Sequence, residues 1–216
     1  MTYYDIHTHH QPTSTEVVAL VNVMVSEDSA RNLHDKKPLF CSVGIHPWYI
    51  KDEKVQLVAL KRMLSFPNVI ALGEIGLDKY ADRPIEEQLS VFRQQALWAE
   101  EKGKFLIVHC VKAWDELIAL KKEIQPQNPW VIHGFRGNAQ LAQQLIRQGC
   151  YLSFGKHFNT EAVRAAWPEH IFVETDDSVI DIRAVYGLVS DALGVSVDTF
   201  ASQIAENVRK ILLFPL

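Results

Sequence analysis

Short apolar runs rich in β-branched residues alternate with longer amphipathic stretches along the whole chain of 216 residues. The apolar runs have the length of buried strands, whereas the amphipathic stretches repeat apolar positions with the period of a helix. Strands are expected over residues 2–7, 17–25, 39–45, 69–74, 105–109, 130–133, 151–154 and 171–175. This alternation is typical of repeated βα units that build a parallel sheet.

Proline, asparagine and glycine mark the ends of several amphipathic stretches. Pro84 and Asn138 lie where helices are expected to begin, since both residue types favour the first positions of a helix. Gly103 and Gly149 precede expected strands, where a helix commonly ends in a left-handed residue. A last helix is expected over residues 197–213.

The first connection between strands differs from the others. Residues 9–16 are too few for a crossover helix and include Pro12, so either a loop joins the first two strands or the second strand is a helix. Eight βα units in a chain of this length predict an α/β fold of the (β/α)₈ TIM type, with an irregular or missing first crossover helix. We expect residues 1–216 to form a single domain.

Composition and charge indicate which partners and which cellular compartment to expect. The formal net charge of -4 gives no global reason to expect an anionic partner, although bound metal ions would add positive charge. Neither a basic leader followed by an apolar stretch nor an apolar run of membrane-spanning length occurs. We therefore expect a cytoplasmic protein with no membrane partner and no obligate protein partner. The cysteines lie in apolar runs and suit buried thiols in a reducing compartment; they are Cys41, Cys110 and Cys150.

Histidines and carboxylates follow the expected strands at their carboxyl ends. His7 and His9 alternate along the first strand, so both side chains point to the same face and can hold one cation. Similar residues lie at the carboxyl ends of the fourth, fifth, sixth and eighth strands, namely Glu74, His109, His133 and Asp176. Because the carboxyl ends of the strands meet at one face of this barrel, we expect all six side chains to bind metal there.

Six ligands exceed the requirement of one tetrahedral site with an open position. The sequence therefore predicts two divalent ions, which histidine and carboxylate ligands allow to be magnesium, manganese or zinc. Glu74 comes from a strand in the middle of the barrel and is therefore expected to bridge the two ions. Asp176 is expected to bind one ion and to act as general base toward water, although a role as ligand alone stays open.

Motifs in this order resemble those of the TatD family of metal-dependent hydrolases. They read "DIHTHH", "GIHPW", "ALGEIGLD", "LIVHC", "VIHGFRG", "YLSFG" and "FVETD", and the closing "ENVRKILLF" is also similar to the family's last motif. The resemblance implies an amidohydrolase-like TIM barrel and the same six metal ligands. It also implies magnesium-dependent 3′ to 5′ exonucleolytic cleavage of DNA or RNA, or hydrolysis of other esters.

Basic residues follow several strand ends by a few positions. They are Lys79, Lys112, Arg136 and Lys156. A basic rim beside the metal ions would suit phosphate groups, and we expect Lys112, Arg136 and Lys156 to contact substrate. Each residue taken alone favours the interpretation as an ordinary solvated charge, so the argument depends on their recurrence at the strand ends.

One histidine and several aromatic residues have two open interpretations. His46 either contacts substrate or supports a ligand, or it is a turn residue packed near Trp48. Tyr80, Trp114 and Phe135 either stack on nucleic-acid bases or anchor the core and loops.

These observations predict a phosphodiesterase or deoxyribonuclease that uses metal-activated water, and the resemblance implies the 3′ to 5′ exonuclease type. Its expected substrate is a phosphoester, such as single-stranded DNA or RNA. One alternative is a carboxylic ester or amide hydrolase, such as an aminoacyl-ester deacylase. Another is a noncatalytic binding protein, against which the retention of all six ligands argues.

Overall fold

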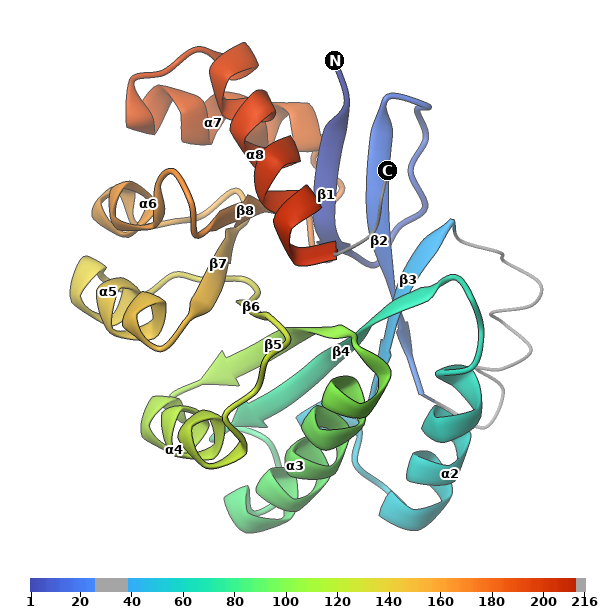
Figure 1. Ribbon diagram of the computed structural model, residues 1–216. Helices are drawn as coiled ribbons and strands as arrows, with labels where there is room; N and C mark the ends of the chain where they lie inside the picture. Colours follow the sequence, from blue (N-terminus) through green and yellow to red (C-terminus); the bar gives the residue numbers. More distant parts are fainter. Residues whose placement is uncertain (26–38, 213–216) are drawn as a thin grey trace. The chain divides into compact units, whose positions relative to one another are not determined.

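The computed structural model describes residues 1–25 and 39–212. Its eight strands follow one another in the sheet in chain order, β1 to β8 (Figure 1). This order confirms the α/β fold predicted from the alternating pattern. The chain divides into two compact units: the first comprises Met1–Leu20 and Val131–Leu216, and the second comprises Val21–Trp130.

The second unit contains three complete strands and the helices that connect them. Its elements, after β2 (Val17–Met24), are β3 (Phe40–Gly44), η1 (Pro47–Tyr49), α2 (Glu53–Met63), β4 (Val69–Asp78), α3 (Ile85–Lys102), β5 (Phe105–Val111) and α4 (Trp114–Ile124). β4 pairs in parallel with both β3 and β5. Figure 1 shows α3 and α4 on the same side of β4 and β5. Buried apolar residues of these elements, such as Leu72, Phe92 and Ile107, contribute to the core of the unit.

Local signals in the sequence explain the helix ends of this unit. The carboxylate of Asp52 accepts a hydrogen bond from Val55 N and caps α2. Pro84 immediately precedes α3, and Gly103 ends it in the left-handed conformation with a φ of 63°. Both positions agree with the sequence prediction.

Glycines allow β4 to approach its neighbours closely. A Cβ atom at Gly76, where φ is 142°, would lie 1.9 Å from the carbonyl oxygen of His109. At Gly73 a Cβ atom would lie 2.5 Å from Cβ of Ile107. Only glycine fits such positions, so the "GEIGLD" motif sets the distance between β4 and β5 beside Glu74 and His109.

The first unit alternates short strands with helices. Its elements are β1 (Tyr3–Thr8), β6 (Trp130–Ile132, beginning in the other unit), α5 (Ala139–Arg147), β7 (Cys150–Phe154), α6 (Thr160–Ala166), β8 (Ile171–Val173), α7 (Ile182–Leu193) and α8 (Val197–Leu212). β7 and β8 pair in parallel. Asn138 caps α5 by accepting from Leu141 N, and Gly149 has a φ of 75°, as predicted.

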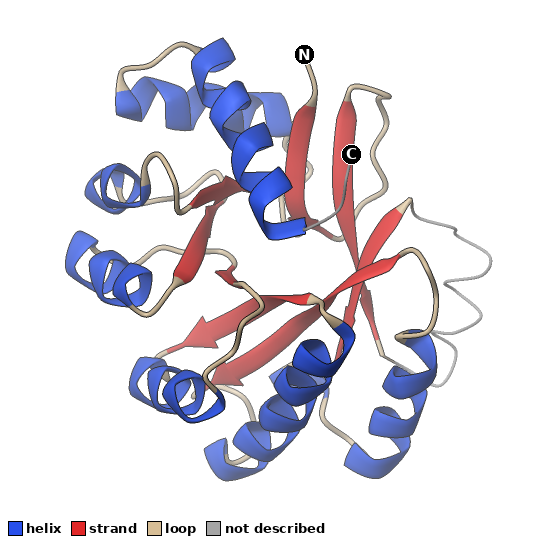
Figure 2. Ribbon diagram, in the orientation of Figure 1, coloured by secondary structure: helices blue, strands red, loops and turns tan. Residues whose placement is uncertain are grey.

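The first connection lacks a helix, as expected from its length. Residues 9–16 form only loop and turn (Figure 2), and residues 17–24 are a strand rather than a helix. The last helix ends at Leu212; position 213 of the predicted helix and Phe214 of the closing motif lie outside the described residues.

Cys41, Cys110 and Cys150 are all buried, as predicted. Burial raises the pKa of the Cys41 thiol to about 12. Within residues 1–25 and 39–212, none of the helices has the length and apolar character required to cross a membrane.

Candidate metal centre

Four of the six predicted ligands lie together in the first unit. Possible ligand atoms of His7, His133 and Asp176 all lie within 4.8 Å of one another. Asp176 Oδ1 is 3.5 Å from His7 Nε2 and 3.6 Å from His9 Nε2. We call these residues, His7, His9, His133 and Asp176, the Asp176 cluster.

Backbone pairing places β1 beside the segment that follows β8. Asp176 N donates to His7 O at 3.0 Å, and His9 N donates to Asp176 O at 3.0 Å. These two bonds explain why His7 and His9, near the start of the chain, lie beside Asp176, which is far away in the sequence. Asp176 itself has a φ of 55°, a left-handed conformation that is strained for a residue with a side chain and is frequent at functional sites.

The second unit holds a cluster around Glu74. Ligand atoms of His46, Glu74 and His109 lie within 4.8 Å of one another, and we call this set the Glu74 cluster. Glu74 Oε1 is 3.2 Å from His46 Nε2 and 3.1 Å from His109 Nδ1. Glu74 is buried and reaches this place at the end of the predicted strand, within the longer observed β4.

His46 and His109 meet Glu74 with different chemistry. His46 Nδ1 accepts a hydrogen bond from Trp48 N at 3.1 Å. In a neutral ring the proton is then on Nε2, which donates toward Glu74. His109 instead places Nε2 2.9 Å from Asp78 Oδ2, which leaves Nδ1 directed at Glu74.

Several supporting residues were missed in the sequence. Asn22 Oδ1 accepts from the backbone N of Glu74 at 2.8 Å and from Ser42 Oγ at 3.2 Å. Asp78 contacts His109 as described. The only available signal for Asp78 was its spacing of four residues from Glu74 in an apolar run, which places both side chains on one face of a strand. Nothing in the local pattern marked Asn22.

Buried acidic residues also support the Asp176 cluster. Glu174 is fully buried, accepts from Gly134 N at 2.6 Å and lies 3.4 Å from His133 Nδ1. Asp5 is buried and accepts from both the backbone N and the hydroxyl of Thr175. Burial raises the pKa of Asp5 to about 7 despite these hydrogen bonds.

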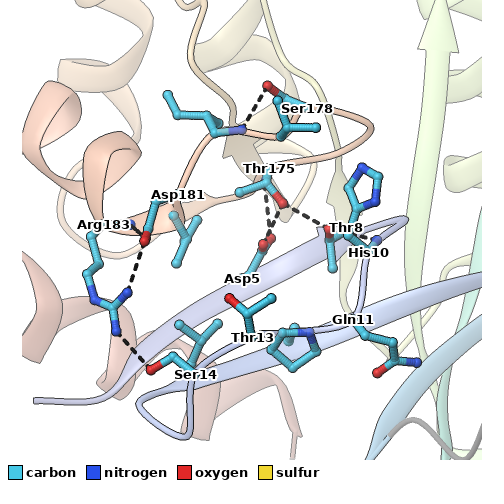
Figure 3. Close-up of a pocket in the computed structure, with 16 residues that line it drawn as sticks. Asp5, Thr8, His10, Gln11, Thr13, Ser14, Thr175, Ser178, Asp181 and Arg183 are labelled. Atoms are coloured by element: carbon cyan, nitrogen blue, oxygen red, sulfur yellow. Dashed lines mark hydrogen bonds and ion pairs between the residues drawn. The ribbon is translucent and has the colours of Figure 1, made fainter.

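A polar cavity of about 490 Å³ lies next to β1 (Figure 3). β1, the 9–16 connection and the start of α7 enclose it, in the place where a first crossover helix is lacking. Thr8 lines it, as does Arg183, which donates to Asp181 and Ser14 on one side. None of the six predicted metal ligands is among the residues that line the cavity.

The predicted substrate contacts are distributed over both units. Arg136 and Lys156 are exposed in the first unit, and Lys156 Nζ donates to Ser178 Oγ at 3.1 Å. Lys112 is exposed in the second unit, directly after β5, with a φ of 59°. A common basic rim therefore stays a prediction, and Lys79 pairs with Glu116 at 2.6 Å.

The aromatic residues proposed for stacking differ in exposure. Phe135 is 1% exposed and packs edge-on against Phe154, so its interpretation as a core residue is correct. Trp114 is partly buried at the start of α4. Tyr80 is 74% exposed and stays available for stacking.

The donor atoms of both clusters suit divalent cations. Each cluster offers imidazole nitrogens and a carboxylate oxygen at mutual distances that one ion can bridge. The buried carboxylate of Asp78 hydrogen-bonds to His109, an arrangement that orients metal-binding imidazoles in proteins. The buried carboxylate of Glu174 lies 3.4 Å from His133 Nδ1.

Comparison with known proteins agrees with this chemistry. A family model described as TatD related DNase matches residues 5–213. The uncharacterized metal-dependent hydrolase YabD of Bacillus subtilis is 29% identical over 148 residues, 64% of this chain and 58% of YabD. The 3′-5′ ssDNA/RNA exonuclease TatD of Erwinia billingiae is 30% identical over 137 residues, 61% of this chain and 51% of that enzyme. The chain thus spans little more than half the length of these relatives.

A solved structure shows the same fold. The crystal structure of YjjV, a TatD homologue from Escherichia coli, superimposes with a TM-score of 0.84 and 21% identity, covering 99% of this chain and 98% of YjjV. This similarity confirms the predicted TIM-type fold class.

Proposed function

The chain belongs to the TatD-related DNase family of metal-dependent hydrolases, and from this premise we propose that it cleaves phosphodiester bonds in single-stranded DNA or RNA from the 3′ end. The observation that carries the proposal is the pair of clusters, each of which brings imidazoles and a carboxylate within 4.8 Å. The name of the Erwinia billingiae relative supports the choice of substrate and direction. A single hydrolase domain over residues 1–216 is part of the proposal.

We assign the metal ions to the six ligands that the sequence predicts. His7, His9, His133 and Asp176 would hold one part of a two-ion centre, and Glu74 and His109 the other. Bound magnesium, manganese or zinc supplies Lewis acidity toward the phosphate and lowers the pKa of water. The chain's own residues then have to orient the substrate and accept a proton.

Asp176 is the proposed proton acceptor. Its side chain is 32% exposed, so water and substrate can reach a carboxylate that His7 and His9 hold in place. A carboxylate within hydrogen-bond reach of the attacking water acts as a general base. Glu74 is buried and is therefore assigned the role of a ligand at the reacting centre rather than that of a proton acceptor.

His46 is assigned a supporting role, one of the interpretations that its motif left open. Its Nε2 donates toward Glu74 and its ring is buried, so it orients the carboxylate instead of contacting substrate first. Arg136, Lys156 and Lys112 are exposed and are the proposed phosphate contacts, because guanidinium and ammonium groups bind phosphate oxygens strongly.

The test is an activity screen after reconstitution with each metal. Single-stranded DNA, RNA, a generic phosphodiester and an aminoacyl ester should be compared on the wild type and on Glu74→Gln, which removes a charged ligand. We expect metal-dependent cleavage of nucleic acid that Glu74→Gln lowers by about 100-fold or more, together with its metal content.

Glu87→Gln is the matched control, because Glu87 is exposed on α3 and pairs only with Arg83 among the described residues. It should keep both activity and metal. Cleavage of the aminoacyl ester alone would favour the deacylase alternative. Binding of nucleic acid without turnover at saturating metal would favour the noncatalytic one.

A further inference from the structure

Trp48 presents an exposed indole beside the Glu74 cluster. The residue is 57% exposed although it is large and apolar. Its ring lies edge-on to that of His46, with centroids 5.4 Å apart and planes at 89°, and edge-on to that of His109 at 6.2 Å and 72°. The indole thus packs against the two histidines of the Glu74 cluster, while more than half of the residue is exposed to solvent.

A buried carboxylate fixes this orientation. Trp48 Nε1 donates to Asp78 Oδ2 at 2.7 Å, and the same oxygen lies 2.9 Å from His109 Nε2. Asp78 is 1% exposed, and a charge-assisted hydrogen bond to a buried carboxylate is among the stronger ones in proteins. The indole is therefore held in place without being buried in the core.

A second exposed aromatic residue depends on the same carboxylate. Asp78 Oδ1 accepts from the backbone N of Tyr80 at 2.8 Å, and Tyr80 is 74% exposed. The carboxylate of Asp78 thus contacts His109, the indole of Trp48 and the backbone of Tyr80 at the same time. A core or loop anchor would bury its ring, whereas these two residues keep large ring surfaces in water.

We propose that Trp48 is a stacking platform for a nucleobase next to the Glu74 cluster. Planar bases stack on aromatic side chains with little regard to sequence, which suits an enzyme acting on single strands. The substrate class of the site is then a chain end that carries a base, in preference to a bare phosphodiester. This inference rests on the proposed nuclease function and specifies it.

Two variants of Trp48 separate stacking from support of Asp78. Both Trp48→Phe and Trp48→Leu lose the Nε1 donor, but only Trp48→Leu loses the aromatic face. The substrates are a single-stranded oligonucleotide and the same strand with an abasic residue at its 3′ end. The measured quantity is the ratio of kcat/KM for the intact strand to that for the abasic strand, with metal content determined in each preparation.

We expect the wild type to prefer the intact strand by about tenfold or more, the scale of one stacked base. Trp48→Phe should keep most of this preference and Trp48→Leu should lose it, at equal metal content. An equal loss in both variants would overturn the proposal, since the indole would then act only through Asp78. Equal cleavage of both strands by the wild type would overturn it while the proposed function stands. If the wild type cleaves neither strand with any metal, the proposed function fails first and this inference with it.

Discussion

At the scale of single residues, a buried carboxylate lies beside one ring nitrogen of two candidate metal-binding histidines, His109 and His133. Asp78 faces His109 Nε2 and Glu174 faces His133 Nδ1, and both carboxylates are essentially inaccessible to solvent. An ionised carboxylate on one ring nitrogen fixes the tautomer and leaves the other nitrogen as the metal ligand. In the proposed metal centre, the Asp78 contact would leave His109 Nδ1 as the ligand atom, and the position of Glu174 would favour Nε2 of His133.

Replacing Asp78 tests this arrangement. Asp78→Asn keeps the size of the side chain but removes the charge that His109 and Trp48 share. We expect the affinity of the metal-free protein for zinc or manganese to fall about 10- to 100-fold, measured by calorimetric titration. Asp52→Asn, at the cap of α2 in the same unit, is the control and should leave the affinity unchanged. Equal affinities for wild type and Asp78→Asn, with the fold intact by circular dichroism, would contradict the assignment.

At the scale of elements, β4 determines where the Glu74 cluster lies. The strand continues in register with β5 from Ile75 opposite Val108 to Asp78 opposite Val111. Its glycines remove the side chains that would hold the two strands apart. The position of His109 relative to Glu74 thus depends on residues that have no side chain.

A substitution at Gly76 should therefore disturb both stability and the site. In Gly76→Ala the new Cβ would lie 1.9 Å from His109 O at a φ of 142°, so the backbone has to move or strain. We expect a loss of roughly 2 to 6 kcal/mol in the free energy of unfolding from strain and overpacking together, and weaker metal binding. Urea denaturation measures the first effect and metal titration the second.

The matched control is Gly187→Ala in α7, where a Cβ atom meets nothing within 4 Å. It should be neutral or stabilising by up to about 1 kcal/mol, because alanine favours the helix. If both variants unfolded at the same urea concentration, the prediction that a side chain at Gly76 destabilises the pairing of β4 and β5 would be wrong.

The sequence was sufficient to predict elements whose signals are local. Apolar runs located all eight strands, and the shortness of residues 9–16 predicted the missing helix. The end of β4 was placed too early, at residue 74 instead of Asp78, because Gly76 interrupts the apolar pattern while pairing with β5 maintains the strand. Tertiary pairing overrides local propensity in such cases.

Parts of the site that depend on distant contacts were not predictable. The link from Trp48 to Asp78 joins a turn to a strand end 30 positions away, and Asn22 reaches the backbone of Glu74 across 52 positions. The local pattern of a single sequence does not indicate which distant residues are in contact. The candidate ligands could be proposed because each lies within a few residues of the end of an apolar run, where the carboxyl end of a strand is expected. Their role as metal ligands stays a prediction.

At the scale of the whole molecule, charge works against a nucleic-acid substrate. Asp and Glu number 26 and Lys and Arg number 22, which gives the net charge of -4. Long-range attraction of a polyanion by the whole protein is therefore weak, and binding has to come from local positive charge. The bound metal ions and a few exposed basic residues would have to supply it.

The salt dependence of binding reports how many such contacts exist. For single strands, the logarithm of the binding constant falls against the logarithm of salt with a slope of about -0.7 for each phosphate contact. Arg136→Met retains most of the apolar stem but deletes the guanidinium that grips a phosphate through two hydrogen bonds. If Arg136 contacts one phosphate, the slope should become shallower by about 0.7 and KM for an oligonucleotide should rise, while the metal content stays that of the wild type.

Arg164→Met is the control, because Arg164 is exposed on α6 of the same unit and pairs with Glu161. Its slope should equal that of the wild type. Identical slopes for all three proteins would remove Arg136 from the substrate site, and binding of the strand would then depend on the ions, on the remaining basic residues and on stacking against the exposed aromatic rings.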